Sequence, residues 1–292
     1  MKKILIGSVI LLAVFVSDAS ASPGVSLKGN GLSFGNVRSG GSIVDGLSLT
    51  LGSSESKQFE EINGVSLSLW KAARRIKGLS ISPFYAGTDD AMKGMALSPL
   101  LSYPNRLKGV AIGGLHTRGN IAGLTIAPFV GNNLLHIPAT IINYALFPLG
   151  FFLGEALVRE PFFLFIHLPA DSGDTMTGIT ISGALMGGNI KGIAIAGLSS
   201  NTNRINGLLI APLYNSSHEL HGMQLGGLMN FADTVHGFQL AFGNGSNELH
   251  GVQIGFFNFS KELHGTQIGI LNLAENNPWY RRILPFINWH EK

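Results

Sequence analysis

A short glycine-centred motif recurs along most of this chain and constrains its fold more than any other feature. The motif has an aliphatic residue two positions before the glycine, an apolar residue at +1, and Leu or Ile at +3. Most copies are 14 or 15 residues apart. The motif glycines are Gly46, Gly64, Gly78, Gly94, Gly109, Gly123, Gly178, Gly192, Gly207, Gly222, Gly237, Gly251 and Gly265. A unit this short cannot bury an apolar side alone, so the spacing predicts stacked repeats.

Each copy reads as a short β-strand bounded by corners. Position +2 is small or polar, as in Ser80, Thr125 and Gln253. A period of two then predicts that +1 and +3 face inward and +2 faces outward. The aliphatic −2 position lies three residues from +1, so a straight strand would place these two positions on opposite faces. We therefore expect a bend or bulge at the glycine, which is free to adopt positive φ. A small residue followed by Pro or Gly at +4 and +5 predicts a second corner.

These features together predict an all-β protein, a β-solenoid of about 13 coils of 14–15 residues. The chain divides into a signal peptide at 1–21, an N-terminal repeat block at 22–133, a hydrophobic insert at 134–177, a C-terminal repeat block at 178–275 and a C-terminal cap at 276–292. The signal peptide is expected because Lys2 and Lys3 precede an apolar run and an Ala19-Ser20-Ala21 cleavage motif. Export from the cytoplasm follows from it.

The alternative architecture is an outer-membrane antiparallel β-barrel acting as a pore or transport protein. Only 13% of residues are charged and 39 of 292 are glycine, which suits a barrel as well as a tightly wound solenoid. Against the barrel, Pro83, Pro99, Pro128 and Pro212 would interrupt strands that have no free edge. We favour the solenoid.

The 55-residue step between Gly123 and Gly178 contains the insert, which is expected to be helical in part. No Asp, Glu, Lys or Arg occurs from 134 to 154, and the length approaches that of a membrane span. Segment 134–168 is therefore expected either to pack on the solenoid or to contact a membrane or surface partner.

Two columns of side chains could carry chemistry. His221, His236, His250 and His264 directly precede the motif glycine and would stack about 5 Å apart. They could bind Zn²⁺ or Ni²⁺ or respond to pH. The same column holds Lys or Asn in other copies, which favours a solvated corner. Gln224, Gln239, Gln253 and Gln267 are expected on the outward face as an amide ladder or binding surface. Asparagines 201, 215, 230, 244, 258 and 272 predict a structural ladder.

Nothing in the sequence predicts an enzyme. There is no recognisable nucleophile, base and acid set, no phosphate loop, no zinc-ligand spacing and no cysteine. No cofactor is therefore expected. The net charge of +3 does not predict a nucleic-acid partner. The sequence instead favours a non-enzymatic, exported surface or envelope repeat protein that acts as a binding or structural scaffold, and it does not identify a protein or glycan ligand.

The segment GVQIGFFNFSKELHGTQIGILNLAENNPWYRRILPFIN resembles a bacterial surface-repeat family known from spirochaetes. That family carries tandem G-x-Q-[IL]-G-x-x-N repeats and has no established biochemical activity. The N-terminal half of the chain keeps the frame but lacks the Gln. The resemblance implies an exported protein at the outer membrane or cell surface of a diderm bacterium, and it supplies no catalytic residues.

Overall fold

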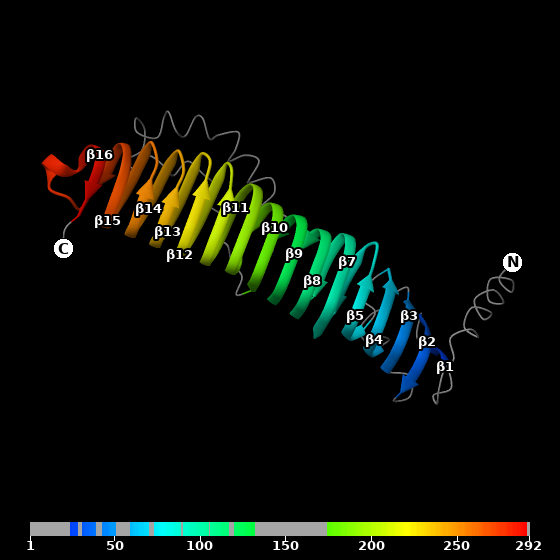
Figure 1. Cartoon of the computed structure of the whole chain (residues 1–292). Helices are drawn as coiled ribbons and strands as arrows, with labels where there is room; N and C mark the ends of the chain where they lie inside the picture. The colour runs from blue at the N-terminus through cyan, green and yellow to red at the C-terminus, as the bar shows by residue number, and fades with distance from the viewer. Residues whose placement is uncertain are drawn as a thin grey trace. The chain divides into compact units, whose positions relative to one another are not determined.

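The structure is a computed structural model that describes residues 24–28, 31–38, 43–50, 59–69, 73–88, 90–104, 106–116, 120–131 and 174–290. In these residues the chain is an all-β β-solenoid of about 11 turns (Figure 1), which confirms the predicted fold class. The chain divides into two compact units, unit 1 (Met1–Ala127) and unit 2 (Pro128–Lys292).

In unit 1 the first strands pair antiparallel and the later ones stack in parallel. The antiparallel pairs are β1–β2 and β2–β3, and parallel pairing begins with β3–β4. The strands are β1 (Gly24–Lys28), β2 (Gly31–Arg38), β3 (Ile43–Thr50), β4 (Phe59–Ser68), β5 (Ala73–Ile81), β6 (Tyr85–Thr88), β7 (Ala91–Pro104), β8 (Arg106–His116) and β9 (Asn120–Gly131), which carries the boundary to unit 2.

Unit 2 is a parallel stack closed by one antiparallel strand. Its elements are β10 (Thr175–Met186), β11 (Asn189–Ala211), β12 (Tyr214–Gly226), β13 (Met229–Leu240), β14 (Gly243–Ile254), β15 (Phe257–Ala274), the 3₁₀ turn η2 (Trp279–Arg281) and β16 (Ile283–Trp289). The glycines of successive copies face one another across each parallel pair, for example Gly222 and Gly237. Because neighbouring copies run parallel, the alternative of an antiparallel barrel is wrong, and a pore built on it loses its structural basis.

The repeat has about 11 full turns rather than about 13 coils. The copies at Gly46 and Gly64 each contribute one strand, β3 and β4, and the residues after these strands lie largely outside the described part. The predicted signal peptide and segment 134–168 also lie outside it. Among the described residues, no helix is both long and apolar enough to cross a membrane.

The glycine column requires glycine for two reasons. Gly222 has a φ of 136°, in the region that side chains disfavour, and the other column glycines with printed values are similar. A Cβ on Gly222 would also overlap the carbonyl oxygen of Gly207 in the preceding turn. The prediction of positive φ is confirmed, and the glycine column sets how closely successive turns approach.

The solenoid interior contradicts the predicted orientation of the strands. Positions +1 and +3 face outward, with Ile195 at 37% and Leu240 at 42% exposure, whereas Gln239 at +2 is at 0%. The −2 residues, such as Leu249 at 0%, are buried as expected. Positions −2 and +2 are four residues apart, so an ordinary strand places both on one face. The prediction that a bend or bulge at the glycine brings −2 and +1 onto one face is therefore wrong.

The glutamines predicted as an outer binding face line the interior instead. Gln224, Gln239, Gln253 and Gln267 are all at 0% exposure, so they cannot form a binding surface. The amide nitrogens of the last three each donate to the carbonyl oxygen of the preceding glutamine, over 2.8 Å from Gln239 and from Gln253, and 2.9 Å from Gln267. Gln224, the first of the four, donates to Ser217 Oγ over 3.0 Å. In-register stacking thus gives each buried amide partners of its own kind, which removes most of the cost of burying it.

A second buried ladder consists of asparagines near the start of the same strands, such as Asn215 in β12. Asn215, Asn230, Asn244, Asn258 and Asn272 are joined by amide hydrogen bonds of 2.8–3.1 Å. Several also donate to backbone carbonyls, as Asn244 does to Ile254 over 2.8 Å. The predicted ladder is confirmed for these five residues. Asn201 was wrongly included, because Ser200 stands opposite Asn215.

We expect Gly222→Ala to lower the free energy of unfolding by at least about 2 kcal/mol, because the new methyl group combines backbone strain with a backbone overlap. The matched control is Gly197→Ala, whose Cβ would meet its nearest neighbour at 3.6 Å without a left-handed φ. Urea unfolding followed by circular dichroism compares the two. Equal losses would contradict the role given to the glycine column.

Gln253→Leu should lower the free energy of unfolding by about 2–5 kcal/mol, because Gln239 Oε1 loses its amide donor and Gln267 Nε2 loses its amide acceptor in a dry interior. Ile195→Gln, a polar substitution on the outward face, should change it by less than about 0.5 kcal/mol. The same urea titration measures both variants. A larger loss for Ile195→Gln than for Gln253→Leu would reverse the assignment of inside and outside.

Candidate functional site

The outward +1 and +3 columns of unit 2 form an apolar face, defined here as the outward side chains at these positions in β10–β15. Ile179 is 43% exposed, Ile181 40% and Met223 42%. Neighbouring turns about 4.8 Å away cover the flanks of each side chain. The exposed fraction is therefore the outward end of the side chain, and the columns present continuous aliphatic surface.

The apolar surface continues around the corner that follows each strand. Leu198 is 51% exposed, and Phe242 and Phe256 stack with their ring centroids 4.9 Å apart. Unit 1 has the same pattern, with Ile112 at 38% on its strand and Leu100 at 49% at its corner. Apolar patches of this extent are rare on a surface that only water contacts.

The cap extends the apolar face of unit 2 rather than ending it. Antiparallel pairing of β16 with β15 places Trp289 opposite Thr266 and Ile287 opposite Ile268, at the ends of the +1 and +3 columns. Beyond these lie the most exposed aromatic side chains of the described residues, Trp279 at 83%, Phe286 at 74% and Tyr280 at 63%. The Arg281 guanidinium lies 4.6 Å from the ring centroid of Trp289.

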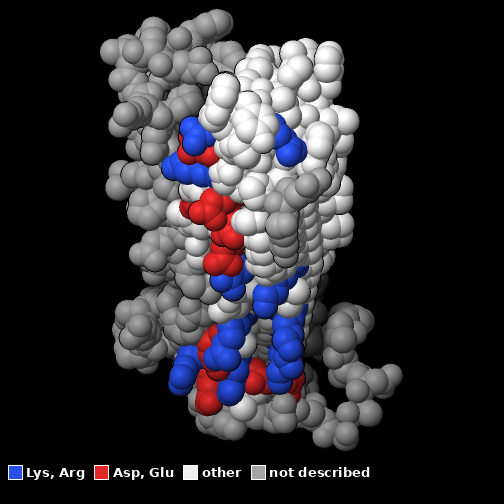
Figure 2. All heavy atoms as spheres, turned by 90° about the vertical axis from the view of Figure 1, so that its left-hand side faces the viewer, with Lys and Arg blue, Asp and Glu red and all other residues white. Residues whose placement is uncertain are grey.

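A polar flank runs beside the apolar face on the same strands. It consists of the outward side chains at −1 and −3, which are polar or charged in most copies. Figure 2 shows Lys, Arg, Asp and Glu gathered in one band, beside surface that carries none of them. In unit 2 the −1 column, which adjoins the apolar face, contains Lys191, Asn206 and the four histidines but no carboxylate.

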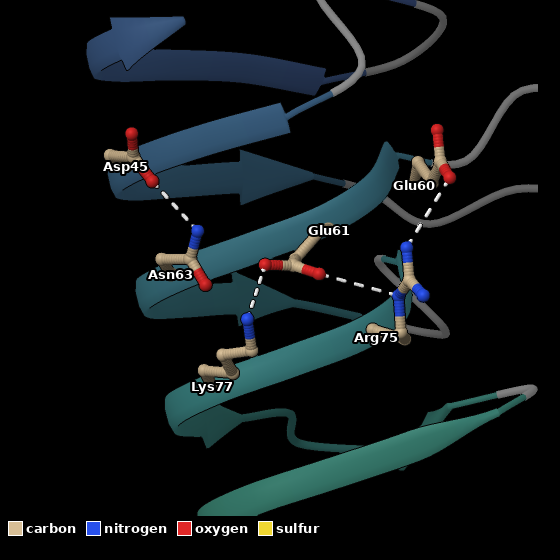
Figure 3. Close-up of polar contacts among 6 residues, drawn as sticks. All are labelled: Asp45, Glu60, Glu61, Asn63, Arg75 and Lys77. Atoms are coloured by element: carbon tan, nitrogen blue, oxygen red, sulfur yellow. Dashed lines mark hydrogen bonds and ion pairs between the residues drawn. The ribbon is translucent and has the colours of Figure 1, made fainter. Parts of the chain in front are cut away.

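Ion pairs between successive turns order this flank in unit 1 (Figure 3). Lys77 Nζ lies 2.7 Å and Arg75 Nε 3.3 Å from the Glu61 carboxylate, while Arg75 also reaches Glu60 at 3.3 Å. Asn63 donates to Asp45 over 2.7 Å. The hydrogen bond from Lys77 is the main reason that the pKa of Glu61 lies below its usual value.

The four histidines stack as predicted. Neighbouring rings of His221, His236, His250 and His264 lie 4.7–4.8 Å apart with planes within 14° of parallel. The His250 side chain is 34% exposed and that of His221 46%, so the column lies on the polar flank. His250 Nε2 lies 2.7 Å from Glu248 Oε1. Glu248, His250 and His264 are the one group of three among the described residues whose ligand atoms come within 4.8 Å of one another.

Reasoning from sequence missed the apolar face as the exposed feature of the molecule. The −2 column contained the signal that could have found it. That column is aliphatic in every copy, and of the positions +1, +2 and +3 only +2 lies an even number of residues from it. A strand that buries −2 therefore also buries +2, and the aliphatic residues at +1 and +3 face outward.

Glu61→Gln should lower the free energy of unfolding near neutral pH by less than about 1 kcal/mol, since the ion pairs that it removes are partly exposed. A folded-state pKa below the unfolded value stabilises the fold above the unfolded pKa, and the effect disappears as pH falls through the folded pKa. The difference from the unchanged protein should vanish by about pH 2. Urea midpoints measure it, with Glu60→Gln as the control expected to change less. A deficit that persisted in acid would contradict this account.

Comparison of the chain with protein-family models, curated proteins and solved structures found no match. The resemblance to a spirochaete surface-repeat family therefore rests on the repeat motif itself.

Proposed function

We propose that this chain is a non-enzymatic β-solenoid scaffold of the bacterial cell envelope, whose apolar face lies against a lipid membrane. The observation that carries the proposal is the exposure of about 40% at successive aliphatic residues, such as Ile179, Ile193 and Ile268, in unit 2. Full burial of such a side chain is favourable by about 1.5–3 kcal/mol, so burial of the exposed part contributes roughly 1 kcal/mol each.

The composition of the apolar face favours lipid over a protein partner. Thr266 is the one polar residue in the +1 and +3 columns of unit 2. Protein interfaces combine an apolar centre with hydrogen-bonding groups that select the partner. Acyl chains offer no hydrogen bonds, so a uniformly aliphatic surface suits them.

The rim of the apolar face also has the chemistry of a membrane interface. Trp279 and Tyr280 are strongly exposed on the cap and adjoin Arg281 and Arg282. Trp and Tyr favour the headgroup region, and Arg and Lys favour lipid phosphates. Lys191 occupies the −1 column beside the aliphatic residues, where it could reach the headgroups of a membrane on that face.

Two sequence features agree with this location. The expected signal peptide at 1–21 would export the chain, and the outer membrane or cell surface is where an exported scaffold meets lipid. Segment 134–168 is apolar in sequence, and we include it as a second membrane contact.

Vesicle flotation tests the proposal on the purified chain, with phosphatidylcholine vesicles containing phosphatidylglycerol. The unchanged protein should float with the vesicles, and Ile195→Glu should weaken binding by about tenfold or more, because a charge replaces a side chain that enters the membrane. The matched control is Thr234→Glu, which adds the same charge on the polar flank and reproduces the Glu found there in other copies.

If Ile195→Glu and Thr234→Glu weaken vesicle binding equally, the effect comes from the change in net charge alone. That result would contradict the apolar contact. Failure of the unchanged protein to float would overturn the proposal. Urea midpoints of both variants should match the unchanged protein, because both positions lie on the surface.

A further inference from the structure

We propose that Glu248, His250 and His264 form a binding site for a divalent transition-metal ion of the Zn²⁺, Ni²⁺ or Cu²⁺ class. The assignment of this site does not rest on the proposed membrane contact. Its basis is the convergence of one carboxylate and two imidazoles, with ligand atoms all within 4.8 Å of one another.

The backbone brings these three side chains together. Residues two apart on a strand point to the same side, so the sequence Glu248-Leu249-His250 presents its acid and its imidazole together. The register of β14 on β15 places His264 beside His250 and Glu262 beside Glu248. Two successive copies of Glu-Leu-His therefore lie next to each other at this point of the stack.

The other histidines lack this arrangement. His236 is preceded by Thr234 instead of a glutamate at −3. His221 has Glu219, but its Nε2 lies 3.9 Å from the carboxylate, and the register partners of the two residues in the preceding turn are Arg204 and Asn206. The metal site is therefore assigned to one end of the histidine column rather than to the whole column.

The donor atoms suit a borderline metal ion. Zn²⁺ and its neighbours in the series bind imidazole nitrogen and carboxylate oxygen, and three protein ligands leave a position for water. His250 Nε2 and Glu248 Oε1 form a hydrogen bond of 2.7 Å, which an ion bound to both atoms would replace. His264 supplies the third ligand atom, within 4.8 Å of those of His250 and Glu248.

Binding of one ion by both imidazoles requires the rings to leave their parallel stacking. The His250 and His264 planes are 14° from parallel with centroids 4.7 Å apart, so their nitrogens must tilt toward a shared ion. The His250 side chain is 34% exposed and can rotate without moving the core. The carboxylate of Glu262, in register with Glu248, is available as a further oxygen ligand or as its support.

Isothermal titration of the purified full chain with Zn²⁺ tests the site. We expect one saturable equivalent, and a loss of affinity of at least about tenfold in His250→Asn and in Glu248→Thr. Both substitutions reproduce residues of the same columns in other turns, Asn206 and Thr234, so both variants should fold. The matched control is His221→Asn, which should keep the affinity of the unchanged protein.

Stability gives a second, independent measurement. Saturating Zn²⁺ should raise the urea midpoint of the unchanged protein and of His221→Asn, but not that of His250→Asn, because an ion stabilises only the state that binds it. Absence of saturable Zn²⁺ binding would overturn the site. Equal loss of affinity in His221→Asn and His250→Asn would overturn it too, by showing diffuse binding along the column.

Discussion

In-register parallel stacking is the constraint on which the rest of this structure depends. Each residue meets the residue at the same position one turn away, about 4.8 Å distant. A buried polar side chain is stable there only if it can pair with a copy of itself. Gln239 and Asn244 meet that condition, because one amide both donates and accepts. Carboxylates and ammonium groups do not, and they occupy the outer polar flank, where Glu61 lies against Lys77.

This constraint explains which features the sequence could predict. The repeat period, the parallel stack, the positive φ of glycines such as Gly222 and the histidine column all follow from residues at fixed spacing. The predicted orientation of the strands is wrong because polarity alone places Gln253 outside and Ile195 inside. Hydrophobicity describes one side chain in isolation. A ladder is a property of the stack, which a single copy of the motif does not contain.

The amide ladders leave the outward aliphatic residues available for contacts outside the chain. If +1 and +3 had formed the core, the surface would carry Gln and Ser and offer a hydrated face. With Gln267 inside and Ile268 outside, the same strand has a polar interior face and an apolar exterior face. A repeat that binds its own turns through side-chain and backbone hydrogen bonds needs fewer of its aliphatic residues for folding. In unit 2 that role stays with the −2 column, represented by Leu249, and with a few other interior residues such as Leu209 and Ala194.

The −1 column is where the two proposed activities meet. Its residues lie on the same strand side as the apolar face and two positions from it, so charge placed there lies at the edge of that face. Lys191 supplies a fixed charge there, and the rings of His236 and His250 stack 4.8 Å apart further along the column. A divalent ion on Glu248, His250 and His264 would add positive charge at this edge. Because lipid phosphates are anionic, metal binding and membrane contact would then reinforce each other through charge rather than through a change of fold.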